Sequence, residues 1–194
     1  MSCTGRLSIT RNRPTPAVLS RGFTLVEILL TITILSVLAS AAVPSFSYAL
    51  AGYRVSGQVN GWLGDLQYTR AEAIKRGQPV TICISSNGTS CSTGTSNWQP
   101  GWIVFADANG NAVVDSGEAV LRKQVALTGG NTFVADNSAR SITFNRDGFA
   151  VGLPAGNVTL TLHDSTSQSG LTRCVAVTTV GRAAVQKAGT GNCS

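Results

Sequence analysis

The sequence predicts an α+β protein, in which one long N-terminal helix packs on a mostly antiparallel β-sheet or β-sandwich domain. Two observations lead to this prediction. A long apolar run begins at Phe23 and has the length of a helix, whereas short β-branched or alternating segments follow one another after Pro79. Gly, Asn, Asp and Ser separate these segments, and no helical pattern recurs between them, so βαβ crossovers are not expected.

The predicted helix has two halves of different character. Glu27 is the only charged residue between Phe23 and Tyr53. Residues 23–50 therefore form a membrane-spanning half, longer than the roughly 20 helical residues that cross a bilayer core. Residues 51–77 form an amphipathic half, because apolar side chains recur there at steps of three and four. This stripe consists of Val55, Val59, Trp62, Leu63, Leu66 and Ile74. The charged residues assigned to the other side are Arg54, Asp65, Arg70, Lys75 and Arg76.

Proline and glycine mark where the helix is expected to bend and to end. Pro44 lacks a backbone donor and clashes with the preceding turn, so a kink is expected near it. Gly77 is suited to cap the helix, and Pro79 blocks its continuation. Residues 78–194 are then expected to form a β-rich globular domain. Its predicted strands cover residues 80–85, 102–106, 120–125, 132–134, 141–145, 158–162 and 173–180.

The charge distribution predicts on which side of a membrane the two ends lie. Residues 1–22 contain four arginines and no acidic residue. This basic flank is expected to stay in the cytoplasm, which places residues 78–194 on the other side. Without residues 1–22, eleven basic and nine acidic residues remain, so the net charge falls from +6 to about +2. That charge gives little electrostatic basis for binding nucleic acid.

Four of the five cysteines fall in the part that is expected to be exported, whereas Cys3 lies in the leader. Disulfides persist outside the cytoplasm. Local spacing favours the pairs Cys83–Cys91 and Cys174–Cys193 among the three possible connectivities. A zinc site is the alternative, but the sequence has no Cys-x-x-Cys pair and its one histidine, His163, is isolated.

The N-terminal motif resembles that of a known family. Arg21-Gly22-Phe23-Thr24-Leu25-Val26-Glu27 is similar to the processing motif of type IV pilins and type II secretion pseudopilins. The resemblance implies that prepilin peptidase, which is also the methylase, cuts between Gly22 and Phe23 and methylates Phe23. It also implies that Glu27 pairs with the N-terminal amine of a neighbouring subunit during assembly. A lone carboxylate at membrane depth independently indicates a functional residue. A plain signal anchor that contains glutamate is the alternative.

Further segments resemble the GspH/FimT group of minor pilins and pseudopilins. They are residues 71–76, 79–80, 101–111, 118–122, 144–148 and the tail from Gly181 to Cys193. The resemblance implies a protein that assembles with other pilins or pseudopilins, or primes their assembly, in a type IV pilus or a type II secretion pseudopilus. It also implies a single-pass protein of the bacterial inner membrane, with its C-terminal domain in the periplasm.

One loop has the spacing of a calcium site. Oxygen-bearing side chains occur at positions 1, 3, 5, 9 and 12 of this loop, where a calcium loop carries its ligands. They are Asp107, Asn109, Asn111, Asp115 and Glu118. Ala112 replaces the usual glycine at position six, and no helices are expected on either side. The alternative is a hairpin in which these residues only supply turn geometry.

The C-terminal region contains part of a DNA-binding motif. Some pilins of this group bind DNA for uptake in transformation through a Gly-Arg-x-Arg sequence, which the resemblance places at Gly181-Arg182-Ala183-Ala184. The second arginine is absent, and Lys187 is the only cation nearby. One or two cations neutralise few phosphates, so DNA binding is expected to be weak. The alternative is a solvated strand end.

No feature of the sequence indicates catalysis. His163 has no nucleophile partner in a recognisable motif, and the many Ser and Thr residues match loops and strand faces. The protein is therefore predicted not to be an enzyme and to need no cofactor, with calcium at the 107–118 loop as the one candidate ligand.

Overall fold

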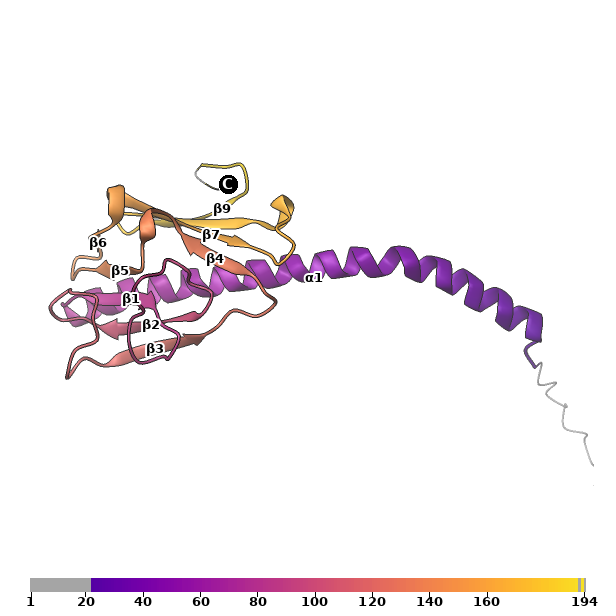
Figure 1. The fold of residues 1–194 in the computed structure, drawn as a ribbon, viewed down its shortest axis with the longest axis horizontal. Helices are drawn as coiled ribbons and strands as arrows, with labels where there is room; N and C mark the ends of the chain where they lie inside the picture. The colour runs from indigo at the N-terminus through magenta and orange to yellow at the C-terminus, as the bar shows by residue number, and fades with distance from the viewer. Residues whose placement is uncertain (1–21, 192, 194) are drawn as a thin grey trace, which may run out of the picture. The chain divides into compact units, whose positions relative to one another are not determined.

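Helix α1 runs from Leu25 to Arg76 and contains 52 residues (Figure 1). The computed structural model describes residues 22–191 and 193, so the predicted leader lies outside the described residues except for Gly22. The chain divides into two compact units, residues 1–44 and residues 45–194. The chain stays helical through Pro44, and the kink expected there stays a prediction.

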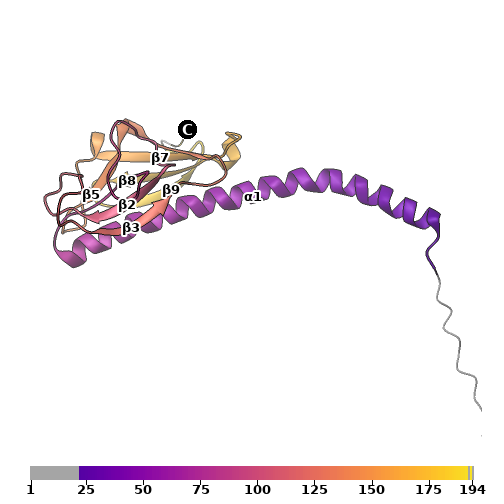
Figure 2. The ribbon, with the colours of Figure 1, turned by 60° about the horizontal axis from the view of Figure 1, so that its bottom comes forward.

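The second unit contains two antiparallel sheets, which lie along the C-terminal part of α1 (Figures 1 and 2). The first sheet has the strand order β3-β2-β1-β5-β6. Its strands are β1 (Val80–Ile84), β2 (Gly101–Ala106), β3 (Val120–Val125), β5 (Ser141–Phe144) and β6 (Ala150–Val151). The second sheet has the order β4-β7-β8-β9, with β4 (Thr132–Ala135), β7 (Asn157–His163), β8 (Arg173–Thr178) and β9 (Ala183–Lys187). Three short 3-10 helices connect strands, namely η1 (Asp136–Ser138), η2 (Pro154–Gly156) and η3 (Ser169–Leu171).

The predicted α+β class and all seven predicted strands are confirmed, with ends that differ by no more than two residues. The sequence did not predict β6 or β9. The first has only two residues, which is too short to show alternation. The second has the sequence AAVQK, in which alanine, glutamine and lysine give little β preference, so its pairing with β8 defines it as a strand.

The core forms where α1 meets both sheets. The side chain of Trp62 on α1 is fully buried and makes edge-to-face contacts with Trp98 and Phe133, each with a centroid distance of 5.7 Å. Trp98 comes from the loop between β1 and β2, and Phe133 comes from β4. The core therefore joins the helix, one loop and a strand of the second sheet.

Three assignments on the amphipathic half of α1 were wrong. Ile74 was placed in the apolar stripe, but 52% of its surface is exposed, and Ala73 occupies the buried position next to it. The buried positions after Trp62 include Leu66, Thr69 and Ala73. These steps of four, three and four residues place Ile74 one residue beyond the buried face.

Asp65 was assigned to the solvent side, but it is buried and connects α1 to the first sheet. One carboxylate oxygen, Oδ2, accepts a hydrogen bond of 2.8 Å from Nε1 of Trp102 on β2. The other, Oδ1, accepts a bond of 2.7 Å from Nη1 of Arg122 on β3. The Arg122 guanidinium also lies 4.2 Å from the ring centroid of Tyr68 on α1. A buried carboxylate needs such partners, because moving a charge from water into the protein interior costs much free energy unless hydrogen bonds or an opposite charge compensate it.

Arg70, also assigned to the solvent side, binds the domain as well. Its Nε donates to the Gly148 carbonyl at 2.9 Å, and its Nη1 donates to the Gly181 carbonyl at 3.2 Å. Gly148 precedes β6, and Gly181 lies in the turn between β8 and β9. Arg70 therefore connects α1 to both sheets at once.

The end of α1 follows the sequence prediction. Gly77 has a φ of 66°, the left-handed region that favours glycine after a helix, and its N–H donates to the Ile74 carbonyl. Within the last turns, Glu72 accepts hydrogen bonds from Arg76 and Lys75. These bonds, chiefly that from Arg76, lower the pKa of Glu72 against the opposing effect of burial. This contribution to stability is present at neutral pH and is lost as acid protonates the carboxylate.

Both expected disulfides are present. Cys83 of β1 is bonded to Cys91 in the following loop, and Cys174 of β8 is bonded to Cys193 in the tail. Beside the first bridge, Ile103, Phe105 and Cys83 form a small buried cluster on the first sheet. The second bridge closes a loop of 19 residues that contains β9, so it holds the C-terminal edge strand to the sheet.

We expect Asp65→Asn to lower the free energy of unfolding by about 1–3 kcal/mol, because an amide nitrogen would then face either the Trp102 or the Arg122 donor. Unfolding in urea can be followed by tryptophan fluorescence, since all three tryptophans are buried in this domain. Asp147→Asn is the matched control, because Asp147 is exposed and should change stability by less than about 0.5 kcal/mol. Equal effects of the two variants would contradict the role given to Asp65.

We expect the Cys174→Ser/Cys193→Ser variant to lose about 2–4 kcal/mol of stability, because the unfolded chain regains the freedom that the bridge removes. Urea unfolding of the purified protein measures this loss, and peptide mapping without reductant checks the pairing. A Cys83–Cys174 peptide in the mapping would contradict the connectivity.

Candidate assembly surface

The processing motif includes the start of α1. Gly22, Phe23 and Thr24 precede the helix, which begins at Leu25. The backbone N–H of Glu27 donates to Oγ1 of Thr24 at 3.2 Å, so Thr24 is the N-cap. Sequence reasoning missed this role of Thr24, although Thr-x-x-Glu before an apolar run is the signature of a capping box.

Glu27 lies in the first turn of α1 and is exposed. The amino-terminal end of a helix carries a partial positive charge, which favours a carboxylate at this position. Within the described part of the chain, Glu27 forms no salt bridge. Its carboxylate is therefore available for a positive group on another molecule.

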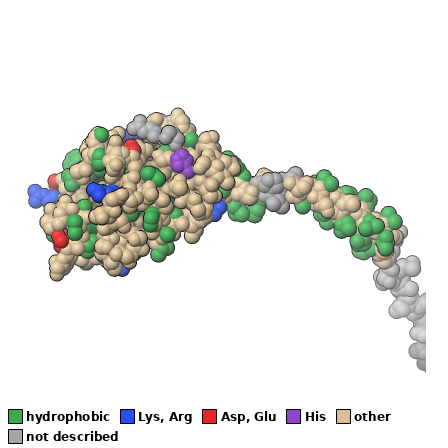
Figure 3. Space-filling view, viewed as in Figure 1, with side chains coloured by type: hydrophobic (Ala, Val, Ile, Leu, Met, Phe, Trp, Pro, Cys, Tyr) green, Lys and Arg blue, Asp and Glu red, His purple; other side chains and the backbone are tan. Residues whose placement is uncertain are grey.

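The described side chains of residues 23–40 are all exposed, although most of them are apolar. Phe23 has 79% of its surface exposed, and Leu25, Val26 and Val37 each exceed 70%. Figure 3 shows hydrophobic side chains at the surface of the N-terminal segment of the helix. By length and composition, α1 is able to cross a membrane.

The hydroxyl groups in this segment are compatible with a membrane. Thr31, Thr33, Ser36 and Ser40 donate hydrogen bonds to backbone carbonyls three or four residues earlier in the helix. A polar group in lipid must be satisfied within the protein, and these bonds meet that requirement.

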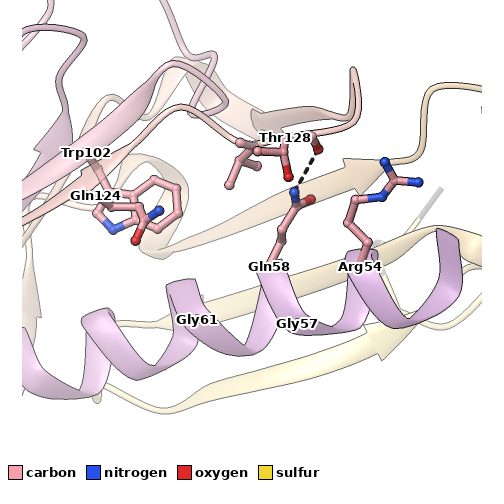
Figure 4. Close-up of a pocket in the computed structure, with 8 residues that line it drawn as sticks. Arg54, Gly57, Gln58, Gly61, Trp102, Gln124 and Thr128 are labelled. Atoms are coloured by element: carbon pink, nitrogen blue, oxygen red, sulfur yellow. Dashed lines mark hydrogen bonds between the residues drawn. The ribbon is translucent and has the colours of Figure 1, made fainter. Parts of the chain in front are cut away.

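A groove of about 280 Å³ lies along the exposed side of α1 in the second unit (Figure 4). Gly57 and Gly61 form its floor, and outside the neighbouring helix backbone nothing lies within 4 Å of a Cβ built on either glycine. One wall includes Trp102 and Gln124 of the first sheet. Bare helix backbone of this kind lets a second chain approach closely.

Gln58 fixes the other wall of the groove. Its Nε2 donates to the Thr128 carbonyl at 2.9 Å, shown as the dashed line in Figure 4, and its Oε1 accepts a bond of 2.7 Å from Asn131. The loop after β3 is therefore held beside the helix. Gly-x-x-x-Gly at residues 57–61 was the available sequence signal, but the wall residues are distant in sequence.

The 107–118 loop is held by its own hydrogen bonds. Asp107 is fully buried, and its carboxylate accepts from Thr81 Oγ1 and from the N–H groups of Asn111 and Ala112. Ala112 has a φ of 58°, the left-handed conformation that a calcium loop usually gives to glycine. Glu118 accepts from the backbone N–H groups of Ala108 and Asp115.

Other side chains of this loop also bind one another. The amide nitrogens of Asn109 and Asn111 donate to the Asp115 carboxylate and hold its pKa below the usual range. Across the residues that the structure describes, no three His, Cys, Asp or Glu side chains gather as a metal site. These hydrogen bonds account for the conformation of the loop without a bound ion, and calcium binding stays a prediction.

Arg182 and Lys187 do not converge on one site. Both are exposed, but Arg182 immediately precedes β9 and Lys187 is its last residue. At about 3.3 Å per residue, the two lie roughly 16 Å apart along the strand. Such a separation gives no concentrated basic patch, and DNA binding stays a prediction.

His163 ends β7, and its Nδ1 is hydrogen-bonded to Thr172 Oγ1 at 3.0 Å. The contact joins the ends of β7 and η3. Thr172 is itself buried, and its hydroxyl also donates to the Gln168 carbonyl. These contacts give His163 a structural role.

Two family models match the chain. The model described as type II transport protein GspH matches residues 58–181, which is more than half of the chain. The prokaryotic N-terminal methylation motif matches residues 19–43. No curated protein matches the chain in a sequence comparison.

Three similar solved structures are all remote in sequence. Two crystal structures of the type IV minor pilin FimU from Pseudomonas aeruginosa share 21% and 20% identity with this chain, with TM-scores of 0.47 and 0.48. They cover 70% of this chain and 90% and 85% of FimU. The minor pseudopilin EpsH of the Vibrio cholerae type 2 secretion system shares 12% identity at a TM-score of 0.48, over 69% of this chain and 97% of EpsH.

These structural likenesses are too remote to carry the assignment, which therefore depends on the family models. The GspH model covers most of the amphipathic half of α1 and most of the β domain, and the methylation motif covers the exposed apolar segment. Together they account for both parts of α1. The chain belongs to the GspH family of type II transport proteins and is a minor pilin or pseudopilin of a type IV pilus or a type II secretion system.

Proposed function

We propose that this protein enters or primes a filament through two contacts on α1, one at Glu27 and one in the groove over Gly57 and Gly61. Before assembly, residues 23–50 hold it in the inner membrane, with residues 78–194 in the periplasm. Prepilin peptidase cuts between Gly22 and Phe23 and methylates Phe23. The family consists of structural pilins and pseudopilins, and the proposal includes no catalytic step.

The observation that carries this proposal is the exposed carboxylate of Glu27 in an otherwise apolar, exposed helix start. A charged side chain at the centre of a membrane-spanning helix costs about 2.5–3.5 kcal/mol on insertion scales, and a lone carboxylate in the first turn of the span carries part of this cost. Pairing with the N-terminal amine of an adjacent subunit offsets part of this cost, because opposite charges attract strongly where water is excluded. The charge therefore favours association with another pilin and contributes nothing to folding of the β domain.

The groove supplies the second contact. Its glycine floor is open to a close approach, and its walls are fixed by the contacts of Gln58 and Trp102. A helix of a neighbouring pilin or pseudopilin fits this shape, because small residues let two helix backbones pack closely. The groove lies on the same continuous helix as Glu27, so one element provides both contacts.

We expect Glu27→Ala to leave the β domain folded and the protein cleaved and in the membrane, but to reduce its incorporation beside other pilins roughly tenfold or more. Co-purification with filament or priming-complex partners measures incorporation, and the cleavage state is scored in the same samples. Thr31→Ala is the control, because it changes another exposed polar side chain of the same segment. Normal incorporation of Glu27→Ala would show that this residue is not the assembly contact.

We expect Gly61→Leu to block the groove and reduce incorporation without destabilising the protein, because a Cβ at this position is in open space in the free subunit. Leucine is also a better helix former than glycine, by up to about 1 kcal/mol. Gly64→Leu is the matched control, because Gly64 is equally open but lies outside the groove. Thermal unfolding and co-purification are measured for both. Equal incorporation of the two variants would reject the groove as a contact.

A further inference from the structure

Two cations face each other at one end of the second sheet. Arg173 of β8 and Lys187 of β9 are direct cross-strand partners. Such partners lie side by side on one face of a sheet, and like charges there are destabilising. The salt bridges found among residues 22–191 and 193 join Glu72 to Lys75 and Arg76, and Asp65 to Arg122. No carboxylate within this range therefore compensates the Arg173–Lys187 pair.

Arg173 is held in place at this position. Its Nη1 donates to the carbonyls of Gly170 and Thr172, at 3.0 Å and 2.7 Å. Since these bonds use one nitrogen of the guanidinium, the planar group is oriented while the rest of its donors remain for a ligand. An oriented guanidinium beside an ammonium group is suited to a phosphate.

A groove of about 360 Å³ adjoins Arg173. Its other lining residues include Tyr48, Tyr53 and Ser56 of α1 and Leu171 of η3, and no acidic side chain lines it. Tyr53 has 77% of its surface exposed and Tyr48 has 46%. The groove therefore combines exposed aromatic rings, a hydroxyl group and one cation, which is a surface for a ligand with both apolar and anionic parts.

The position of this groove along α1 indicates what the ligand is. The proposed membrane-spanning half, residues 23–50, ends beside this groove. Tyr48 lies in the last turn of this half, and Tyr53 follows its end by about 4.5 Å at about 1.5 Å per residue. The headgroup region beyond the bilayer core is about 5–8 Å thick, and tyrosine is enriched at this boundary. Lipid headgroups are thus within reach of the groove.

We propose that Arg173 and Lys187 bind the phosphate of an anionic phospholipid whose glycerol and upper acyl carbons contact Tyr48 and Tyr53. The bound lipid compensates the two adjacent cations and holds the β domain at the membrane surface before assembly. This inference depends on the membrane-spanning role proposed above for residues 23–50. An acidic surface on a partner protein is the competing occupant, and the proximity of the groove to the end of the span favours the lipid.

The test uses the full-length protein in nanodiscs of phosphatidylcholine alone and in nanodiscs that also contain phosphatidylglycerol. Native mass spectrometry counts the lipids that stay bound after the nanodisc is removed. We expect the wild type to retain phosphatidylglycerol in preference to phosphatidylcholine. The Arg173→Gln/Lys187→Gln variant should retain roughly tenfold less phosphatidylglycerol.

Two further variants make the result specific. Lys187→Gln alone leaves the Arg173 hydrogen bonds intact, so a loss of lipid in this variant is not due to a disturbed loop. Arg182→Gln removes an exposed cation at the other end of β9 and should keep wild-type retention. Tryptophan fluorescence confirms that each variant is folded.

Equal retention of the two lipids by the wild type would overturn the proposal. A loss of phosphatidylglycerol in Arg182→Gln as large as that in the double variant would overturn it as well. Unchanged lipid retention together with reduced partner co-purification in the double variant would assign the cations to a protein partner and would overturn it too. Insertion into the nanodisc is scored separately. Insertion without preferential retention rejects the lipid site alone, whereas failure to insert rejects the membrane-spanning role on which it depends.

Discussion

The contact on which the rest of the domain depends is the buried carboxylate of Asp65. It accepts hydrogen bonds from Trp102 and Arg122, so one side chain of α1 connects the helix to two strands of the first sheet. This contact fixes the rotation of the helix about its own axis. With Asp65 turned inward, Trp62 enters the core and Gly61 faces outward. The same contact that stabilises the domain therefore determines which face of the helix is left for the proposed contact with a neighbouring subunit.

The two parts of α1 have different physical requirements. The second unit buries one face of the helix against its sheets, whereas the described side chains of residues 23–40 are exposed and mostly apolar. Such a surface is stable only in lipid or against other apolar helices. Membership of the GspH family accounts for this division, because a pilin or pseudopilin associates with other pilins in a filament. Thr24 caps α1 by accepting a hydrogen bond from the Glu27 N–H, so the processing motif also contains the start of the helix.

Features that depend on neighbouring residues were predictable from the sequence, and those that depend on distant contacts were not. The apolar run, the seven strands, the Gly77 cap and the cleavage motif are all local patterns. Asp65 was misplaced because charged residues are rarely buried unless paired, and its partners lie 37 and 57 residues away. Trp98 likewise belongs to a polar loop but is fully buried. Of the assembly surface, Glu27 could be identified from its motif, but the groove requires the folded domain.

The most direct test of the central claim, that α1 stays on the mature protein as its assembly segment, is the intact mass of the protein from membranes that contain prepilin peptidase. We expect a chain that begins at Phe23 and carries one added methyl group at its N-terminus. Retention of residues 1–22, or cleavage after the apolar run, would contradict it. In the first case Phe23 would have no free amine, and in the second the mature protein would lack Glu27.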